Sequence, residues 1–273
     1  MSLSLDHYVV IGNPIAHSKS PQIHRIFAQQ TQQNLSYETL LAPLDGFAAS
    51  VRNFITSGGK GANVTVPFKL QAFSLATQLT PRASVAGAVN TLLFDAEYIL
   101  GDNTDGAGLV RDIVTNAACE ITGKRVLLMG AGGAARGALL PLLEQRPSEL
   151  VIANRTLSKA EELVDLAQGL DSHDMVVRAS SWEALDEPFD LIINATAASL
   201  AQQVPPIAAI VFAKNCLAYD MMYSENITPF LSFARQHGAQ TRDGWGMLVE
   251  QAAEAFYLWR GVRPDTGSLL ASD

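Results

Sequence analysis

The sequence has few charged and few aromatic residues, and it lacks the runs that mark several classes of protein. Charged residues make up 17% and aromatic residues 7% of the 273 positions, with a formal net charge of −8. No cluster of lysine and arginine stands out, so we expect no nucleic-acid partner and no anionic membrane surface. Any anionic ligand must therefore be held by a few local donors.

Cysteine is also scarce. Cys119 and Cys216 lie far apart in no metal-binding spacing, and no HExxH motif occurs, so we expect no metal site. Two separate cysteines fit a reducing compartment. The opening MSLSLDHYVVIG lacks the basic and long apolar regions of a signal peptide, and no apolar run reaches membrane-spanning length. We therefore expect a cytoplasmic protein with no membrane partner.

What the chain does have is enough apolar residues, 48%, to bury a large core, and a length that suggests two domains. Short strands alternate with helices over the first hundred residues, which indicates an α/β layer. Strands are expected at 7–12, 35–42, 61–69 and 88–103, the last as a hairpin. Helices are expected at 20–32, 45–58, 69–80 and 104–117, the first capped by Ser20 and opened by Pro21.

From Lys124 onward the pattern is that of a doubly wound sheet. KRVLLMGAGGAARGALLPLLEQ reads as strand, glycine loop and helix, and ELVIANRT, DMVVRASS, FDLIINAT and CLAYDMMY read as further strands. A domain boundary is expected within 103–110, where glycines soften the chain. The last helix, GMLVEQAAEAFYLWRG, is expected to stop at Gly261.

A glycine-rich loop follows an apolar strand in this second half. GAGGAA fits the form G-x-G-x-x-(G/A), follows RVLLM and opens a helix. In that context glycines let the backbone turn tightly and approach a pyrophosphate on the helix N-terminus. An ordinary strand–helix turn is the alternative. The context favours dinucleotide binding by Gly130, Ala131, Gly132, Gly133 and Ala134.

The end of the next strand favours NADP over NAD. An acidic residue there would accept a hydrogen bond from the ribose 2′-hydroxyl, but the sequence has Asn154, Arg155 and Thr156. With Lys159 a turn later, cationic and neutral donors suit a 2′-phosphate. Alternatively, Thr156 or Ser158 caps a helix beside solvated cations, and Thr156 can serve both purposes. We expect NADP as the cofactor.

Polar side chains also occur at the ends of apolar strands in the first domain. ANVTVPFK reads as a buried strand that Pro67 ends, yet it carries Asn63, Thr65 and Lys69. Such residues could converge at the carboxyl end of the strand, where ligands bind in open α/β sheets. Other polar positions of this kind are Ser18, Ser20, Asn90 and Asp105.

Each of these positions has a plainer interpretation. Taken alone, Lys69 reads as a solvated lysine at a strand end. The serines and the aspartate could cap helices, and the asparagine could satisfy a turn. His17 and His24 are expected at the surface or at helix caps.

The last helix points to a ligand independently. At 100° per residue, Gln251 falls in the middle of an apolar stripe, opposite Glu250 and Glu254. A buried amide needs hydrogen-bond partners, and a polar ligand lying between the two domains would supply them.

Together these features predict a cleft rich in hydroxyl and amide groups beside a nicotinamide site. The substrate would be small, with several hydroxyls or carbonyls, and the chemistry a hydride transfer between carbonyl and alcohol. A Lys69–Asp105 pair is a reasonable proton device, because the aspartate would hold the ammonium and the two groups would titrate jointly.

Longer motifs carry a resemblance to a known family. GNPIAHSKSP, GANVTVPFK, AGAVNT, NTDG, GAGGAARG, NRT, YDMMY and GWGMLVEQAA resemble the shikimate dehydrogenases, NADP-dependent enzymes of aromatic amino acid biosynthesis that reduce 3-dehydroshikimate to shikimate. The resemblance covers essentially the whole chain. It implies an N-terminal α/β substrate domain of residues 1–104 and 245–273, to which the C-terminal helix returns, and a Rossmann-like NADP-binding domain of residues 105–244.

The resemblance also implies a role for each matching residue. Lys69 and Asp105 would be the catalytic pair, with Lys69 passing the proton at the carbonyl that is reduced. The substrate carboxylate would be bound by Ser18, Ser20 and Tyr223, and the ring hydroxyls by Asn63, Thr65, Asn90 and Gln251. The nicotinamide pocket would be lined by Met221 and Gly244.

Some positions depart from the family's usual pattern. Ala197 and Ser199 stand where a serine and a glycine are common, and Pro81 occupies a place that is often acidic. Lys159 replaces a more usual arginine, so a bidentate phosphate grip becomes a point charge. We expect NADP preference with a somewhat weaker clamp.

Two alternatives remain open. A quinate/shikimate dehydrogenase paralogue could use NAD, although such paralogues tend to carry an acidic residue where Arg155 stands. A catalytically silent dinucleotide-binding module would have lost Lys69, Asp105 or the serines. The sequence does not distinguish a monomer from a homodimer.

Overall fold

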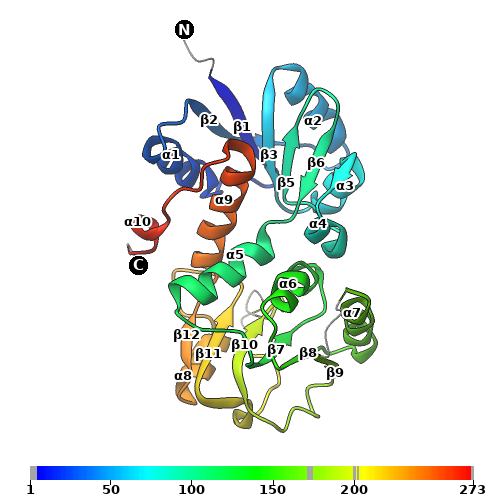
Figure 1. Ribbon diagram of the computed structural model, residues 1–273, viewed down its shortest axis with the longest axis vertical. Coiled ribbons are helices and arrows are strands. Elements are labelled where there is room, and N and C mark those ends of the chain that lie inside the picture. The colour runs from blue at the N-terminus through cyan, green and yellow to red at the C-terminus, as the bar shows by residue number, and fades with distance from the viewer. Residues whose placement is uncertain (1–4, 171–174, 199–200, 202, 272–273) are drawn as a thin grey trace. The chain divides into compact units, whose positions relative to one another are not determined.

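The computed structural model describes residues 5–170, 175–198, 201 and 203–271. The chain divides into two compact units, which we describe separately (Figure 1). Unit 1 consists of Met1–Gly108 and Val249–Asp273, and unit 2 of Leu109–Leu248.

The chain changes unit inside two continuous helices. It leaves unit 1 within α5 (Asp105–Arg111) and returns within α9 (Trp245–Arg260). Each change falls four residues later than the sequence-based boundaries after 104 and 244. At the first change, Gly106 and Gly108 lie within the turns of α5 and do not form a linker, and at the second, α9 runs through the boundary without a break.

Unit 1 contains a mixed sheet that has six strands over its described residues. The strand order is β2-β1-β3-β5-β6-β4, in which β2, β1 and β3 are parallel and β5 and β6 form the expected antiparallel hairpin. The strands are β1 Asp6–Gly12, β2 Leu35–Leu41, β3 Gly59–Val64, β4 Gln78–Leu79, β5 Thr91–Phe94 and β6 Ile99–Asp102. The other helices of this unit are α1 Ser20–Gln30, α2 Phe47–Thr56, α3 Lys69–Leu75, α4 Pro81–Ala86 and α10 Gly267–Leu270.

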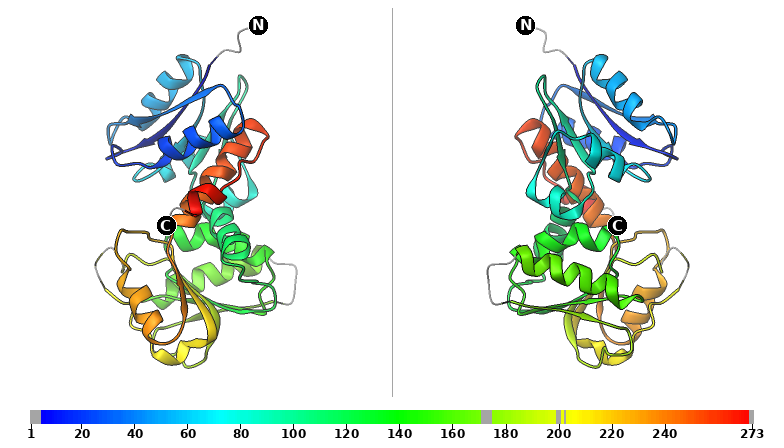
Figure 2. Two further views of the ribbon diagram at one scale, coloured as in Figure 1. Left: turned by 90° about the vertical axis from the view of Figure 1, so that its left-hand side faces the viewer. Right: turned by 90° about the vertical axis from the view of Figure 1, so that its right-hand side faces the viewer.

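Alternating side chains on β1 give this sheet two buried faces. Ile11 lies in one apolar cluster with Phe47 of α2, whereas Val10 belongs to a separate cluster on the opposite face. Helices α1 and α9 pack together, with the Phe27 and Phe256 rings 5.9 Å apart, and Figure 2 shows the two helices side by side. The C-terminal helix therefore completes the core of unit 1, as the family resemblance implies.

The strand at ANVTVPFK is shorter than its sequence-based prediction. β3 ends at Val64, and its pairing with β5 ends one residue earlier, at Asn63. Pro67 therefore lies beyond the ladder, and Lys69 begins α3. Polar residues after Val64 lie in a turn at the carboxyl edge of the sheet.

The helix predicted over 69–80 was wrong in its second half. Helix α3 ends at Leu75 because Ala76 adopts an extended backbone (φ −63°, ψ 134°). The short strand β4 and a new helix, α4, then follow. Thr80 caps α4 by accepting from the Ala83 N–H, and Pro81 occupies its first turn.

Unit 2 contains a parallel sheet of six strands, counted over its described residues. The order β12-β11-β10-β7-β8-β9 is that of a doubly wound Rossmann-like fold, as predicted. The strands are β7 Arg125–Met129, β8 Glu149–Ala153, β9 Val176–Ser180, β10 Phe189–Asn194, β11 Phe212–Asp220 and β12 Gln240–Arg242. The helices are α6 Gly133–Glu144, α7 Leu157–Leu170 and α8 Pro229–Gln236, with a π-helical turn at Asp112–Asn116 and a 3-10 turn at Ala209–Val211.

The strands of unit 2 bury both faces. Leu128 of β7 lies in one cluster with residues of α6 and α7, and Leu127 lies in another with Phe230 of α8. Sequence patterns did not predict α8 or β12, which are short. In the described ranges, no helix is long and apolar enough to cross a membrane.

Candidate active site

The Lys69–Asp105 pair forms at the carboxyl edge of the unit 1 sheet. Lys69 is the first residue of α3 and Asp105 the first residue of α5. The lysine Nζ lies 2.5 Å from the aspartate Oδ2, and the two side chains are 31% and 20% exposed. The ammonium is thus paired with a carboxylate and still reachable by a small molecule.

Neighbouring backbone groups hold both members of the pair. The carbonyl oxygen of Lys69 accepts from the Val89 N–H at 3.0 Å. The N–H of Asp105 donates to the Asn103 side-chain oxygen at 3.2 Å. The loop before β5 and the loop after β6 therefore fix where the ammonium and the carboxylate meet.

Asn90 links the catalytic pair to the last helix. Its side-chain nitrogen donates to Asp105 Oδ1 at 2.8 Å and lies 3.4 Å from Gln251 Oε1. Its side-chain oxygen accepts from the Thr104 N–H at 2.9 Å. Gln251 is 9% exposed, so the amide in the apolar stripe is buried as predicted and finds its polar neighbours inside unit 1.

Asn63 extends this polar cluster. It is the next-to-last residue of β3 and is 6% exposed. Its side-chain oxygen accepts from the Tyr37 hydroxyl at 2.7 Å, and its nitrogen donates to Thr91 Oγ1 at 3.0 Å. Four of the predicted residues, Lys69, Asp105, Asn90 and Asn63, are therefore joined with Gln251 by short polar contacts within one unit.

Among the remaining predicted substrate residues, Thr65, Ser18 and Ser20 belong to unit 1, whereas Tyr223 belongs to unit 2. Thr65 follows β3 directly, and its N–H donates to the Ile11 carbonyl at 2.9 Å. Ser20 is 8% exposed, and its N–H donates to Ser18 Oγ at 3.3 Å. Tyr223 belongs to unit 2, where its ring lies 5.9 Å from that of Trp245.

The capping role predicted for Ser20 was wrong. Lys19 occupies the N-cap position of α1, and Ser20 is the first helical residue. The hydroxyl of Ser20 is instead a neighbour of Tyr37. Burial raises the pKa of Tyr37 well above its usual value, and the hydrogen bond with Ser20 opposes part of that rise.

The surface or cap position predicted for His24 was also wrong, whereas His17 is exposed. His24 has no exposed area, and its ring stacks on Tyr37 with centroids 4.0 Å apart. Neither ring nitrogen makes a hydrogen bond of good geometry among the described residues, although the Asn63 side chain opposes part of the effect of burial on the pKa of His24. Burial lowers the pKa of His24 to about 3, so the ring is neutral at physiological pH.

The glycine loop of unit 2 leaves its backbone open. Gly130 follows β7 with φ +105°, and a Cβ there would lie 3.1 Å from the Ala195 carbonyl oxygen. At Gly132 and Gly133, an added Cβ would meet no heavy atom within 4 Å. Because Gly133 begins the twelve-residue helix α6, a phosphate can approach its N-terminal N–H groups.

The predicted 2′-phosphate residues follow β8. The Asn154 side chain donates to the Thr156 carbonyl at 2.8 Å, which shapes the turn into α7. Arg155, Thr156 and Lys159 are exposed and free to reach a ligand. Together with the open glycine loop, this donor set fits NADP.

The residues predicted beside the nicotinamide lie at the same edge of unit 2. The Met221 N–H donates to the carbonyl of Asn194, the last residue of β10, at 3.0 Å. The N–H of Gly244 donates to the carbonyl of Met222, also at 3.0 Å. Of the departures from the family pattern, Ala197 is exposed, and Ser199 lies outside the described residues.

Sequence patterns missed several members of the unit 1 cluster. Thr91 and Thr104 stand inside motifs that were singled out, but a threonine in a strand or loop gives no signal of its own. Tyr37 lies on β2, which β1 separates from the strand of Asn63, and reads as an ordinary strand residue. Only the pairing order of the sheet brings it to Asn63.

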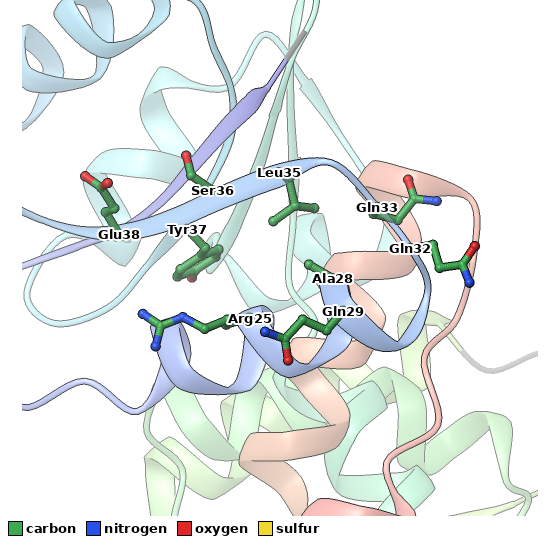
Figure 3. Close-up of a pocket in the computed structure, with 9 residues that line it drawn as sticks. All are labelled: Arg25, Ala28, Gln29, Gln32, Gln33, Leu35, Ser36, Tyr37 and Glu38. Carbon is green, nitrogen blue, oxygen red and sulfur yellow. The ribbon is translucent and has the colours of Figure 1, made fainter. Parts of the chain in front are cut away.

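A separate pocket of about 510 Å³ opens between α1 and β2 of unit 1 (Figure 3). Its wall includes Arg25, Gln29, Tyr37 and Glu38. None of the predicted catalytic, substrate or cofactor residues lines it. In the described ranges, no group of three or more His, Cys, Asp or Glu side chains could hold a metal ion.

Comparison with known proteins gives matches along the chain. Residues 10–92 match the family described as "Shikimate dehydrogenase substrate binding domain", residues 112–203 match "Shikimate / quinate 5-dehydrogenase", and residues 244–270 match "Shikimate 5'-dehydrogenase C-terminal domain". The shikimate dehydrogenase (NADP(+)) of Herminiimonas arsenicoxydans is 63% identical over 271 residues, which are 99% of this chain and 98% of that protein.

Solved structures match over nearly the whole chain as well. An Ael1 enzyme from Pseudomonas putida is 50% identical with a TM-score of 0.92, covering 97% of both chains. Shikimate 5-dehydrogenase from Thermus thermophilus, in complex with NADP(H) and shikimate, is 30% identical with a TM-score of 0.85, again covering 97% of both.

The fold and the site define a two-unit α/β enzyme of the dinucleotide-dependent oxidoreductase class. One unit carries a lysine–aspartate pair among buried amides, and the other carries a Rossmann-like sheet with an open glycine loop. With 63% identity to a curated relative over 99% of its length, the chain belongs to the shikimate dehydrogenase family.

Proposed function

We propose that this chain catalyses the reversible NADPH-dependent reduction of 3-dehydroshikimate to shikimate. The observation that carries the proposal is the Lys69–Asp105 pair, 2.5 Å apart, bonded through Asn90 to a cluster of amides and hydroxyls. A cyclic substrate with several hydroxyls needs such a set of donors and acceptors. The names of the relatives supply the substrate and the cofactor.

In this proposal Lys69 donates the proton to the oxygen of the carbonyl that is reduced, and accepts it back in the reverse direction. Asp105 holds the ammonium in place through their short contact. Asn90 donates to the other oxygen of the same carboxylate, which fixes its orientation. The pair acts as one device, so changing either member should affect the same step.

The other polar residues position the ring. Asn63, Asn90 and Gln251 would bind ring hydroxyls, with Thr65 beside them at the turn after β3. Ser18 and Ser20 would bind the carboxylate through hydroxyl groups, with Tyr223 of unit 2 as a further donor. Neutral donors at the carboxylate suit a chain with a net charge of −8, which offers no broad basic surface.

NADPH, when bound, supplies the hydride. The residues that would hold its pyrophosphate are Gly130, Ala131, Gly132, Gly133 and Ala134. Its 2′-phosphate would be held by Asn154, Arg155, Thr156 and Lys159, and its nicotinamide by Met221 and Gly244. A guanidinium where NAD-specific proteins place a carboxylate supports NADP over NAD.

Substitution of the lysine tests the proton-transfer role. Lys69→Ala should lower kcat by about 10² to 10⁴ with a much smaller change in KM. Asp105→Asn keeps an oxygen for Asn90 but removes the charge opposite the ammonium, so it should also act mainly on kcat. Lys60→Ala, which changes an exposed lysine on β3, is the matched control and should keep the wild-type rate. An unchanged kcat in Lys69→Ala would mean that Lys69 is an ordinary solvated lysine and takes no part in proton transfer.

A quinate/shikimate paralogue is the second candidate. It shares the fold and the catalytic pair, and one matching family is described as "Shikimate / quinate 5-dehydrogenase". Comparable rates with 3-dehydroquinate or with NADH would favour it.

We also propose a cytoplasmic enzyme whose ligands are small molecules, acting as a monomer or a homodimer. Both cysteines are free, which fits a reducing compartment. Light scattering of the purified protein would decide between the two assembly states.

A further inference from the structure

A buried ion network ties together two elements that carry site residues. The loop after β6 leads from Asp102 to Asp105, and helix α9 carries Gln251. Arg82, on the short helix α4, bonds to both elements. Its guanidinium meets Asp102 on one side and Glu254 of α9 on the other, at 2.5 Å and 2.9 Å.

The Asp102 end of this network holds the loop that leads to Asp105. The Asp102 side chain is 1% exposed. Its Oδ1 accepts from Thr80 Oγ1 at 2.6 Å, Arg82 Nε at 2.7 Å and the Asn103 N–H at 2.7 Å. The Asn103 side chain in turn accepts from the Asp105 N–H. Asp102 and Asn103 therefore connect Arg82 to the backbone N–H of Asp105.

The Glu254 end holds the helix that carries Gln251. Glu254 lies about one turn after Gln251, and its other oxygen accepts from Arg263. Arg263 also donates to Glu250 at 2.8 Å, whose side chain is 1% exposed. Carboxylates on both sides of Gln251 are thus anchored. The sequence-based placement of both glutamates opposite Gln251 was wrong for Glu254, because residues three apart lie on the same side of a helix, and it gave no partner for either.

The distance between the loop after β6 and helix α9 matters because Asn90 contacts a residue of each. Its side-chain nitrogen contacts Asp105 Oδ1 at 2.8 Å and lies 3.4 Å from Gln251 Oε1. If the loop and the helix moved apart, one of these contacts would be lost. Arg82 is well suited to prevent such movement, because a planar guanidinium bonds in fixed directions at both ends.

Arg82 remains charged in this setting. Burial alone would lower its pKa, but the hydrogen bonds and charges of Asp102 and Glu254 more than offset burial and raise it. The cation therefore balances Asp102, which would otherwise be buried without a counter-charge, and it shares Glu254 with Arg263.

We infer that Arg82 is a positioning residue for the reaction: it fixes the loop of Asp102 against helix α9, and so sets where Asp105 and Gln251 meet Asn90. This role rests on the proposed function, because it assumes that these residues act on the substrate. Displacement of a positioned group by about 1 Å can slow a reaction about 100-fold. The role is distinct from touching substrate or cofactor.

Two variants test the role without leaving a buried carboxylate unpaired. Arg82→Met combined with Asp102→Asn removes both charges and keeps an oxygen for Thr80 and for the Asn103 N–H. Glu254→Gln weakens the link between Arg82 and α9, and also the pairing of Glu254 with Arg263. We expect kcat to fall about ten- to a hundredfold in the double variant and less in Glu254→Gln. Arg82→Lys, with a single ammonium in place of the fork, should recover part of the rate.

Arg260→Met is the matched control. Arg260 lies on α9, the helix of Glu254, and pairs with Asp6 at 2.6 Å, away from the polar cluster. The Arg260→Met variant should have a lower unfolding temperature, and its kcat should stay within about twofold of wild type. If the Arg82 variants lose stability like this control but keep full kcat when folded, Arg82 only stabilises unit 1 and the inference is overturned. Should the double variant not fold, Glu254→Gln decides by the same criterion.

A crystal structure of the double variant gives a readout that does not depend on turnover. The inference requires the Asp105 carboxylate or the Gln251 amide to move away from Asn90, and unmoved side chains would overturn it. Turnover of the wild-type protein is measured first. Its absence would contradict the proposed function, whereas a normal wild-type rate with unaffected Arg82 variants would contradict only the positioning role.

Discussion

Burial of His24 predicts a specific loss of stability in mild acid. The ring has no exposed area, stacks on Tyr37 and lies 5.4 Å from the Trp259 ring. Burial lowers its pKa from 6.5 to about 3. Below pH 6.5 the unfolded chain binds a proton at this residue that the folded protein does not bind until about pH 3. Stability is therefore complete above pH 6.5 and falls as the pH decreases toward 3.

The size of this effect follows from the shift. Each pH unit between the two pKa values corresponds to about 1.4 kcal/mol. At pH 5 the loss is therefore about 2 kcal/mol, and its limit near pH 3 is about 5 kcal/mol. Such a loss is a large part of the stability of an ordinary domain.

Urea unfolding of the wild type and of His24→Phe at pH 7.5 and pH 5.0 measures how much unfolding free energy the protein loses through His24 in mild acid. Phenylalanine keeps an aromatic ring for stacking and has no group to protonate. Its packing cost is the same at both pH values and cancels in the difference. We expect the wild type to lose about 2 kcal/mol more than the variant between the two pH values.

His17→Gln, at an exposed histidine, is the control and should follow the wild type. Equal losses in the wild type and in His24→Phe would refute the reasoning, because they would mean that folded His24 accepts a proton in mild acid.

Four further substitutions, all in unit 2, test other parts of the structure. Arg155→Ala should weaken NADPH binding about ten- to a hundredfold and NADH binding far less, since only NADPH carries the 2′-phosphate; equal losses in a binding titration would make the residue structural. Gly130→Ala should destabilise unit 2 by about 1–3 kcal/mol in thermal unfolding, because its φ is +105° and the new Cβ would lie 3.1 Å from a carbonyl oxygen. Gly132→Ala, with open space around the added Cβ, should instead keep stability and weaken NADPH binding, and a stable variant with normal binding would argue against a pyrophosphate there. Gly246→Ala should cost about 3 kcal/mol or more, because its Cβ would overlap the buried carboxylate of Asp112; a wild-type unfolding temperature would contradict this.

The polar residues of the site could be predicted because they break apolar patterns. Asn63 in a buried strand and Gln251 in an apolar helical stripe both need partners, and the structure supplies them within unit 1. The glycine loop could be predicted because strand, loop and helix are contiguous in sequence. Segments that follow one another in the sequence are also neighbours in space, so such a motif can be recognised without knowing any long-range contact.

The parts that could not be predicted depend on how strands and helices pair across the chain. His24 is buried because α1 packs against α9, more than 200 residues later, and nothing near His24 in the sequence indicates that contact. Arg82 meets Glu254 for the same kind of reason. The helix predicted through Thr80 failed because apolar spacing in that segment continues across the extended backbone at Ala76.

The most direct test of the proposed function follows absorbance at 340 nm with 3-dehydroshikimate or 3-dehydroquinate, each combined with NADPH or NADH. The proposed function predicts fast turnover only with 3-dehydroshikimate and NADPH. No turnover in any combination, with NADPH still bound, would contradict the catalytic assignment of Lys69 and Asp105.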